Sequence, residues 1–406
     1  MAESAKDISC LKEKICGSSE KYAQEIKTLC RYIFNHPETG LKEYQSSSAV
    51  IALLEKHGFV VEKGCAGMET SFRAVRALKK PGPRIAFLCE YDALPSIGHA
   101  CGHNIIAAGS AGAAMIAADY MDEYGGEIIV LGTPAEEGGG GGKVRLLNAG
   151  YLDDCDCAMM LHPGFKNMSR DRFTAINRFK FIYHGKAAHA AGDPQSGINA
   201  LEAVLQLFRG VDGLRLHLKK DISVHGIITK GGVAINMIPD LCEAQFAVRG
   251  LKRSELSTVI NRLFDCAKAA ALATGCTLET EEIGLGYDDF VVNTALSDLL
   301  AECMNAFQLK VRERTADDGM GSTDAGNVSH KLPTLHGVIS FNNEYLGLHT
   351  IEFKERCGSN AGEELALTAA GVLGLEALCI MTDRSILKHA WAEHEEATGK
   401  GAPVQS

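Results

Sequence analysis

Several features that would point to membranes, secretion or nucleic acids are missing from this chain of 406 residues. No stretch reaches the ~20 uninterrupted apolar residues needed to span a bilayer. The first fourteen residues mix acidic and basic side chains without the apolar centre of a signal peptide. There is no long basic run, and the formal net charge is −10, which argues against nucleic-acid and anionic membrane partners.

The cysteines lack the regular spacing of a disulfide framework. Fourteen are scattered along the chain, which predicts reduced thiols and a cytoplasmic location. Cys155 and Cys157 form a close pair, but they lead into a strand and are assigned no metal. A phosphate-binding loop is also missing, because Lys143 of the glycine-rich stretch is followed by Val144, where that motif needs Ser or Thr.

What the chain does contain is an α/β alternation. Its length predicts two domains at ~150 residues each, and its hydrophobic content of 46% is ample for a large core. Apolar strands alternate with helical patterns, which is typical of α/β folds. The predicted helices are 19–35, 46–56, 105–120, 295–307 and 361–380, and the predicted strands include 71–77, 84–89, 127–131, 157–161 and 335–341.

The pattern changes in the middle of the chain to strand-helix-strand-strand-helix-strand, the ferredoxin-like order. We therefore predict a catalytic domain from residues 1–174 and 289–406, interrupted by an inserted domain at 175–288. The inserted strands are predicted at 178–183, 222–229, 242–248 and 277–280, and the helices at 198–214 and 254–274.

Side chains that can bind metals stand where predicted strands end. Cys101 and His103 follow the strand at 84–89, and Gly102 between them lets the backbone fold tightly. A thiolate and an imidazole in this arrangement can face one ion. By itself, however, the pair is also consistent with a buried structural cysteine that happens to lie beside a histidine.

Two further strand ends strengthen the metal hypothesis. Glu136 and Glu137 follow the strand at 127–131, and adjacent carboxylates repel unless a cation lies between them. A solvated flexible loop with incidental acids is the alternative, whereas a phosphate site is disfavoured because the carboxylates would repel the ligand. His162 ends the next strand. A lone histidine is usually structural, but here it is the third strand end with a possible ligand.

Together these motifs resemble the co-catalytic metallopeptidases of family twenty, in the amidohydrolase branch of auxin-conjugate hydrolases, N-acyl-amino-acid deacylases and p-aminobenzoyl-glutamate hydrolases. The likeness spans nearly the whole chain, and its detail at 90–92 and 101–104 is similar to the aminobenzoyl-glutamate hydrolase and dipeptidase-like subgroup. The matching segments are 92–95, 99–103, 134–139, 161–163, 185–191, 236–239, 321–327 and 349–350. The resemblance implies a mixed-sheet, phosphorylase/hydrolase-like catalytic domain with an inserted lid and dimerisation domain.

The resemblance also implies a site with two divalent metal ions, Zn²⁺ or Mn²⁺ and possibly Co²⁺. Glu136 would be the general base, and Cys101 would bridge the ions. Because adjacent residues at a strand end point opposite ways, Glu137 is expected to bind metal while Glu136 faces the substrate. Many relatives have Asp at Asn104, which is not counted as a ligand. The implied ligands are Cys101, His103, Glu137, His162 and His349.

In the inserted domain the resemblance implies that His189 stabilises the oxyanion, often from a partner subunit. Asn236 and Arg249 would contact a substrate carboxylate. A surface loop histidine and an ordinary strand-end charge are the alternatives for His189 and Arg249. His99 is expected to orient the Cys101 loop, while His336 matches the family's ligand position less well than His349 does.

The sequence therefore predicts a metal-dependent amidohydrolase acting on N-acyl amino acids or aminobenzoyl-glutamate-like conjugates, with a small-molecule substrate and a homodimeric assembly. A dipeptidase for β-alanyl or other small dipeptides is the alternative within enzymes. From another class, a non-catalytic amino-acid or metal binding protein on the same fold is the rival, because a fold does not fix a function.

Overall fold

The computed structural model describes residues 2–315, 318–341 and 346–401, and it divides into two compact units. Unit 1 comprises Met1–Arg172, Phe290–Gly319 and Asp324–Ser406, and unit 2 comprises Phe173–Asp289 and Met320–Thr323. The sequence predicts the inserted domain at 175–288, without the short stretch 320–323. That stretch joins unit 2 because the backbone N–H and hydroxyl of Thr174 both donate to the carbonyl of Gly321, at 2.9 and 3.1 Å.

Unit 1 is built on a six-stranded mixed sheet in the order β1-β2-β4-β3-β5-β12. Strands β4, β3, β5 and β12 run parallel, whereas β1 and β2 pair antiparallel at one side. The parallel strands therefore bring their carboxyl ends to one edge. The strands are β1 Val60–Lys63, β2 Phe72–Ala77, β3 Arg84–Cys89, β4 Glu127–Gly132, β5 Cys157–Gly164 and β12 Thr334–Ser340.

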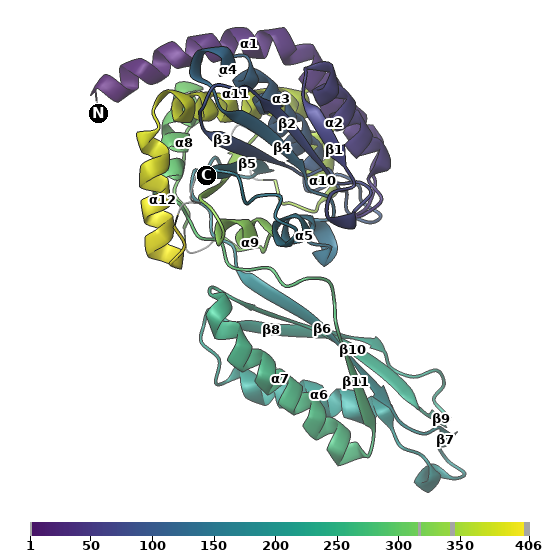
Figure 1. The fold of residues 1–406 in the computed structure, drawn as a ribbon. Coiled ribbons are helices and arrows are strands. Elements are labelled where there is room, and N and C mark those ends of the chain that lie inside the picture. Colours follow the sequence, from purple (N-terminus) through teal and green to yellow (C-terminus); the bar gives the residue numbers. More distant parts are fainter. Residues whose placement is uncertain (1, 316–317, 342–345, 402–406) are drawn as a thin grey trace. The chain divides into compact units, whose positions relative to one another are not determined.

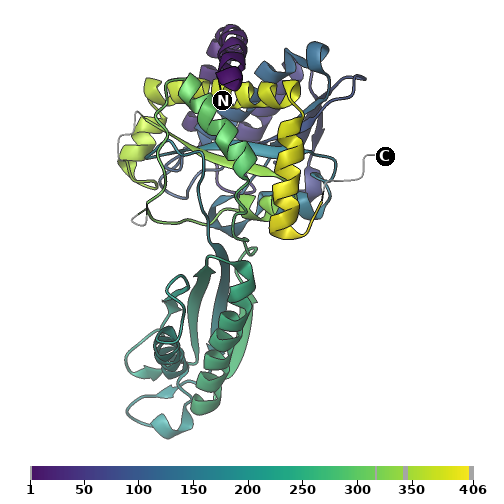
Figure 2. The ribbon, with the colours of Figure 1, turned by 90° about the vertical axis from the view of Figure 1, so that its left-hand side faces the viewer.

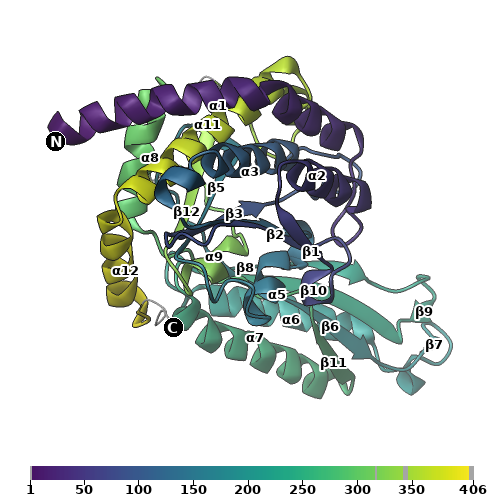
Figure 3. The same ribbon diagram turned by 45° about the horizontal axis from the view of Figure 1, so that its top comes forward.

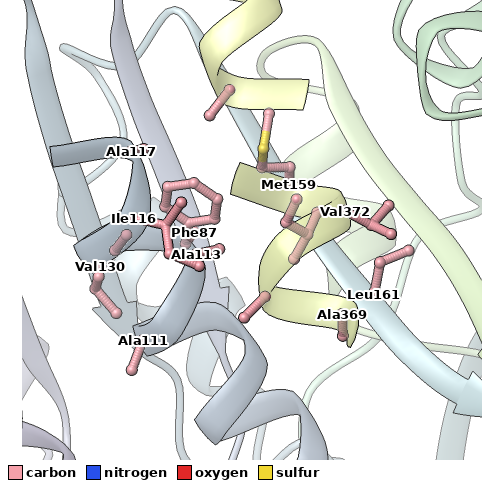
Figure 4. Packing of buried hydrophobic residues seen from close by; sticks show 14 of the residues in the cluster. Phe87, Ala111, Ala113, Ile116, Ala117, Val130, Met159, Leu161, Ala369 and Val372 are labelled. Carbon is pink, nitrogen blue, oxygen red and sulfur yellow. The ribbon is translucent and has the colours of Figure 1, made fainter. Parts of the chain in front are cut away.

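Helices α3 His103–Ala118 and α11 Asn360–Thr382 cover one face of this sheet, and α1 Ala2–Asn35 packs against both of them (Figures 1 and 3). Every residue of α3 is buried. Figure 4 shows Phe87 and Val130 of the sheet beside Ile116 of α3, with Met159 and Val372 continuing the packing towards α11. By length and composition α11 could cross a membrane, but 83% of its most apolar stretch lies inside unit 1, as expected for a core helix.

Two details of the helices differ from the prediction. Helix α1 starts far before residue 19, because Ile8 and Ile15 continue the buried stripe of the predicted segment at seven-residue spacing. The second helix also begins earlier than predicted: α2 starts at Tyr44, two residues before position 46, and Glu43 precedes it. The other helices of unit 1 are α2 Tyr44–Lys56, α4 Met121–Tyr124, α5 Gly142–Asn148, α8 Thr294–Ala306, α9 Ala325–Ser329, α10 Ile351–Cys357 and α12 Ser385–Thr398.

Unit 2 has a four-stranded antiparallel sheet in the order β11-β6-β10-β8, with both helices on one face (Figure 2). This confirms the predicted ferredoxin-like arrangement. Alternate residues of β10 are buried beneath the helices, as a half-covered strand requires. The elements are β6 Ala175–His184, β7 Ala188–His189, α6 Ala200–Arg215, β8 Ser223–Lys230, β9 Met237–Ile238, β10 Leu241–Gly250, α7 Arg253–Thr274 and β11 Thr277–Glu282.

Candidate metal centre

The loop between β3 and α3 presents Cys101 and His103 at the carboxyl edge of the sheet. His103 is the first residue of α3, and Gly102 before it has φ +79°. A Cβ atom on Gly102 would lie 2.4 Å from Cγ of Pro163. Only glycine therefore fits both the backbone conformation and the space between this loop and β5.

Replacing Gly102 with alanine is expected to lower the free energy of unfolding by about 2 kcal/mol or more, because a left-handed backbone strain is added to a steric clash. Chemical denaturation of the metal-free protein measures this. Gly58→Ala is the matched control, because Gly58 also has positive φ but a Cβ there meets nothing within 4 Å. An equal loss of unfolding free energy in Gly102→Ala and Gly58→Ala would show that the contact with Pro163 does not contribute to the effect.

Three of the predicted ligands form one donor group. Ligand atoms of Cys101, His103 and His162 lie within 4.8 Å of one another, and Sγ of Cys101 lies 3.5 Å from Nε2 of His162. Nδ1 of His162 is 2.7 Å from the carbonyl of Pro163, so the ring holds its proton on Nδ1 and offers Nε2. This set of one sulfur and two nitrogens suits a transition-metal ion.

A second donor group shares Cys101 with the first. It consists of Cys101, Glu137 and His349, again within 4.8 Å of one another. Nε2 of His349 lies 3.3 Å from Oε1 of Glu137. His349 has φ +62°, and its backbone N–H donates to the carbonyl of Ala100 at 2.9 Å. The structure thus brings all five predicted ligands together, in two groups that meet at one sulfur.

The residues fit metal ions by their chemistry as well as by position. Burial raises the pKa of the Cys101 thiol well above its ordinary value, so a thiolate there needs a nearby cation. In the described part of the chain, the buried Oε1 of Glu137 and Nε2 of His103 have only long ion-pair contacts, each 3.3 Å, with Nε2 of His349 and Oε2 of Glu90 respectively. Cations would satisfy these atoms.

Asp92 contacts one member of each donor group, His103 of the first and Glu137 of the second. Its Oδ1 lies 2.9 Å from Nδ1 of His103, and its Oδ2 accepts the backbone N–H of Glu137 at 2.9 Å. The carboxylate fixes the histidine proton on Nδ1 and leaves Nε2 for a cation, which is the usual arrangement behind metal-binding histidines. Asp92 belongs to a matched motif, but no role was assigned to it from the sequence.

Glu136 and Glu137 do not project from a strand, so the predicted reason for their opposite directions is wrong. Strand β4 ends at Gly132, and Glu136 has helical φ −65° and ψ −46°. Both side chains offer oxygens within 4.8 Å of His103. The surroundings of the two carboxyl groups nevertheless differ, which lets one act as a general base and the other as a metal ligand.

The pKa values of these two carboxyls are shifted in opposite directions. Burial raises the pKa of Glu136 well above its ordinary value, and the charges of Glu90 and Asp324 raise it further. Burial also acts to raise the pKa of Glu137, but the hydrogen bond with His349 and the charge of His103 hold it below its usual value. Glu136 is therefore the better proton acceptor, and Glu137 the better ligand.

Glu43 anchors the loop that carries Glu136. Its Oε1 accepts the backbone N–H of Ala135 at 2.9 Å, where the chain has φ +58°, and its Oε2 accepts the hydroxyl of Thr70 at 2.7 Å. Glu43 is fully buried. Burial raises its pKa to about 7. Glu43 could not be identified from the sequence because it lies in the turn before α2, far from any matched motif.

The raised pKa of Glu43 predicts a pH dependence of stability. Between about pH 4.5 and 7 the folded state holds this proton more tightly than the unfolded state does, so the contribution of Glu43 to stability falls as pH rises through that range. The difference in free energy of unfolding between the metal-free wild type and Glu43→Gln should therefore favour the wild type more at pH 5 than at pH 8. A pH-independent difference would contradict the shifted pKa.

Two other histidines near the site do not belong to the donor groups. His336 is buried and stacks on His162 with ring centroids 5.8 Å apart, and burial lowers its pKa to about 3. His99 is buried with its ring 6.4 Å from that of Phe34, and its predicted orienting role stays a prediction. Asn104 donates to the carbonyl of Cys357 at 3.2 Å, inside the core.

The remaining predicted residues lie in unit 2. His189 on β7 is exposed, and its Nδ1 accepts the backbone N–H of Gly192 at 2.9 Å. Asn236 accepts the N–H of Ala190 through its backbone carbonyl, also at 2.9 Å. Arg249 on β10 donates to the hydroxyl of Ser322 at 2.9 Å. Their predicted roles stay predictions.

Comparisons with known proteins identify the family of this chain. Residues 86–356 match the profile of peptidase family M20/M25/M40. The chain is 34% identical over 403 residues to the Xaa-Arg dipeptidase of Mus musculus, covering 95% of this chain and 92% of the relative. It is 25% identical to a p-aminobenzoyl-glutamate hydrolase polypeptide from Escherichia coli, covering 92% of this chain and 93% of the relative.

Solved structures share the fold. An aminobenzoyl-glutamate utilization protein from Klebsiella pneumoniae aligns with a TM-score of 0.73 at 22% identity, covering 90% of this chain and 98% of that one. A dinuclear metal binding peptidase of family M20 from Bacillus subtilis aligns with a TM-score of 0.67 at 20% identity, covering 89% and 99%. The chain therefore belongs to peptidase family M20/M25/M40 and is a metal-dependent amide hydrolase.

Proposed function

We propose that the chain hydrolyses the amide bond of N-acyl amino acids or aminobenzoyl-glutamate-like conjugates, with two divalent cations as cofactors. The observation that carries this is a pair of donor groups that share Cys101 and lie beside Glu136. Cys101, His103 and His162 would hold one cation, and Cys101, Glu137 and His349 the other. Zn²⁺, Mn²⁺ and Co²⁺ all accept mixed sulfur, nitrogen and oxygen donors.

When bound, the cations lower the pKa of a water molecule and polarise the substrate carbonyl. The Glu136 carboxylate takes a proton from that water as its oxygen bonds to the amide carbon. Glu136 then gives the proton to the amine that leaves as the carbon–nitrogen bond breaks. A pKa raised by burial suits both transfers, because the same group must accept and return the proton.

The unit 2 residues are proposed to bind the substrate. Because Nδ1 of His189 accepts a backbone N–H, the ring carries its proton on Nε2. That N–H can donate to the oxygen on which charge develops during attack. The Arg249 guanidinium keeps N–H groups beyond the one given to Ser322, and two of them can bind a carboxylate.

We propose a homodimer assembled through strand β8. This strand is one edge of the unit 2 sheet and exposes 61% of Ile227 and 42% of Ile228. The opposite edge, β11, carries three glutamates that discourage strand pairing. Sedimentation should show a dimer that Ile228→Lys converts to a monomer. A monomeric wild type would contradict this assembly.

A cytoplasmic location is also proposed. All fourteen cysteines are free thiols in the structure, and Cys101 must stay reduced to bind a cation. Fractionation of cells that express the chain tests this proposal. Recovery in a secreted or membrane fraction would contradict it.

A dipeptidase is the second candidate function. It is favoured by the higher identity to the Xaa-Arg dipeptidase than to the aminobenzoyl-glutamate hydrolase, 34% against 25%, over similar coverage. Both activities break an amide bond next to an amino acid, so one site serves either. The residues that would distinguish them contact the acyl half of the substrate, where a dipeptide carries a free amine.

The experiment is amide hydrolysis by metal-stripped protein, with and without added Mn²⁺, Zn²⁺ or Co²⁺. The substrates are aminobenzoyl-glutamate, acetylated and longer acyl amino acids, and dipeptides with α-amino or β-alanyl first residues. Metal-dependent turnover of acyl amino acids or aminobenzoyl-glutamate supports the proposal, and preference for dipeptides supports the second candidate. Bound metal with no turnover would favour a non-catalytic binding protein.

A further inference from the structure

Three buried charged side chains, Glu90, Lys143 and Asp324, form a network next to His103 of the first donor group. Nζ of Lys143 lies 2.6 Å from Oε1 of Glu90 and 2.5 Å from Oδ1 of Asp324. The backbone N–H of Lys143 also donates to Oδ2 of Asp324 at 2.9 Å. None of the three is more than 1% exposed, and no other lysine or arginine in the described ranges is classed as buried.

Stability alone is a weak reason for such a network. Each buried ion costs several kcal/mol of desolvation, and well-packed apolar side chains often replace buried ion pairs without loss. The network also contains two carboxylates for one ammonium, which leaves an excess negative charge in the interior. A functional role at the neighbouring metal centre explains the arrangement better.

Glu90 is the member that reaches the metal centre. Its Oε2 lies 3.3 Å from Nε2 of His103. Because Asp92 occupies Nδ1 of this histidine, Nε2 is the nitrogen offered to a cation. Two ligands that are each about 2.0–2.2 Å from one ion lie roughly 3.3–3.6 Å apart in a tetrahedral arrangement. A small movement would therefore let Glu90 coordinate the same cation, although in this structure it belongs to neither donor group.

We propose that Lys143 is a positioning residue that holds Glu90 off the cation bound through His103, and so keeps one coordination position open. This role rests on the proposed metal-dependent hydrolysis. Catalytic metal sites differ from structural ones by such an open position, where water or substrate binds. The ammonium achieves this by holding Oε1 of Glu90, which limits the approach of Oε2.

This role differs measurably from that of a merely structural ion pair. If Lys143 only supported the fold, its loss would lower stability, cation affinity and turnover together. If it restrains Glu90, its loss should let that carboxylate coordinate the cation. Cation binding would then become tighter while turnover falls, and removal of the Glu90 charge should reverse both effects.

The test compares the wild type with Lys143→Met and with the double variant Lys143→Met/Glu90→Gln. Affinity for Co²⁺ is measured by competition with a coloured chelator, and the absorption spectrum of bound Co²⁺ reports its coordination number. For Lys143→Met we expect about 10-fold tighter Co²⁺ binding, a spectrum with an added ligand, and a kcat lower by about 100-fold with little change in KM. The double variant should regain the wild-type affinity and spectrum, and part of the lost kcat.

Weaker Co²⁺ binding in Lys143→Met, an unchanged spectrum, or no reversal by Glu90→Gln would overturn the proposal. Lys331→Met is the matched control, since this half-exposed lysine pairs with Asp153 on the surface, and it should change none of these quantities. If Lys143→Met fails to fold, the same comparison is made with Asp324→Asn added to both variants, because this removes the other buried charge.

Measurements on the wild type alone distinguish a failure of the proposed function from a failure of the proposed role of Lys143. A wild type that binds Co²⁺ but cleaves none of the amides would contradict the proposed function. In that case the affinity and spectrum of the variants still decide whether Lys143 restrains Glu90. An active wild type with unchanged affinity and spectrum in the variants would contradict only the role of Lys143.

Discussion

Glu136→Gln is expected to lower kcat by about 10³-fold, within the range that general acid–base catalysis contributes. Glutamine keeps the size and shape of the side chain but cannot accept the proton of the attacking water. Because Glu136 is not in either of the two groups that share Cys101, the number of bound cations should stay at the wild-type value. Steady-state kinetics and elemental analysis of the same samples measure the two quantities.

Glu137→Gln is the matched comparison, since it makes the same chemical change at the adjacent residue. It removes the carboxylate that lies 3.3 Å from His349, so a loss of bound cation should accompany its loss of turnover. The account would be contradicted if Glu136→Gln kept its turnover. It would also be contradicted if the two variants lost the same amount of cation.

Cys101→Ala should have the largest effect on cation content, because both donor groups contain this sulfur. We expect bound cations to fall from two per chain to near zero, with a matching loss of turnover. His349→Ala removes a ligand from one group only, so it should keep about one cation per chain at a concentration that saturates the wild type. Elemental analysis after gel filtration gives these numbers.

Cys303→Ala controls for the loss of a buried thiol, since Cys303 is buried on α8 and lies outside the donor groups. It should keep both cations. If Cys101→Ala retained two cations while His349→Ala lost one, the sulfur would not be the shared ligand. If Cys101→Ala and His349→Ala lost the same number of cations, the two cations would not bind to separate donor groups. The description of two groups would then be wrong.

Much of the fold could be predicted because hydrophobic periodicity is local. The alternation in unit 1, and the four-stranded sheet and two helices of unit 2, follow from spacing along the chain. Parallel strands then place Cys101, Glu137 and His162 at one edge of the sheet, which is why three strand ends were enough to indicate a metal site. His349 follows no strand end directly, and only the family resemblance pointed to it.

The buried charges could not be predicted in the same way. Lys143 and Asp324 are 181 positions apart, and nothing local in either segment indicates that they meet. Glu90 lies in what looks like an ordinary turn after a strand. The directions of Glu136 and Glu137 were also argued wrongly, because the loop after β4 takes helical and left-handed backbone angles instead of continuing the strand.

The central claim is that two cations share Cys101 and are needed for hydrolysis. Its most direct test is titration of metal-stripped protein with Co²⁺, following both amide hydrolysis and the sulfur-to-cobalt absorption band. We predict that hydrolysis rises only as Co²⁺ is added, that binding ends at two equivalents, and that the band is absent in Cys101→Ala. Full hydrolysis by the metal-stripped protein, or saturation at one equivalent with no sulfur band, would contradict the claim.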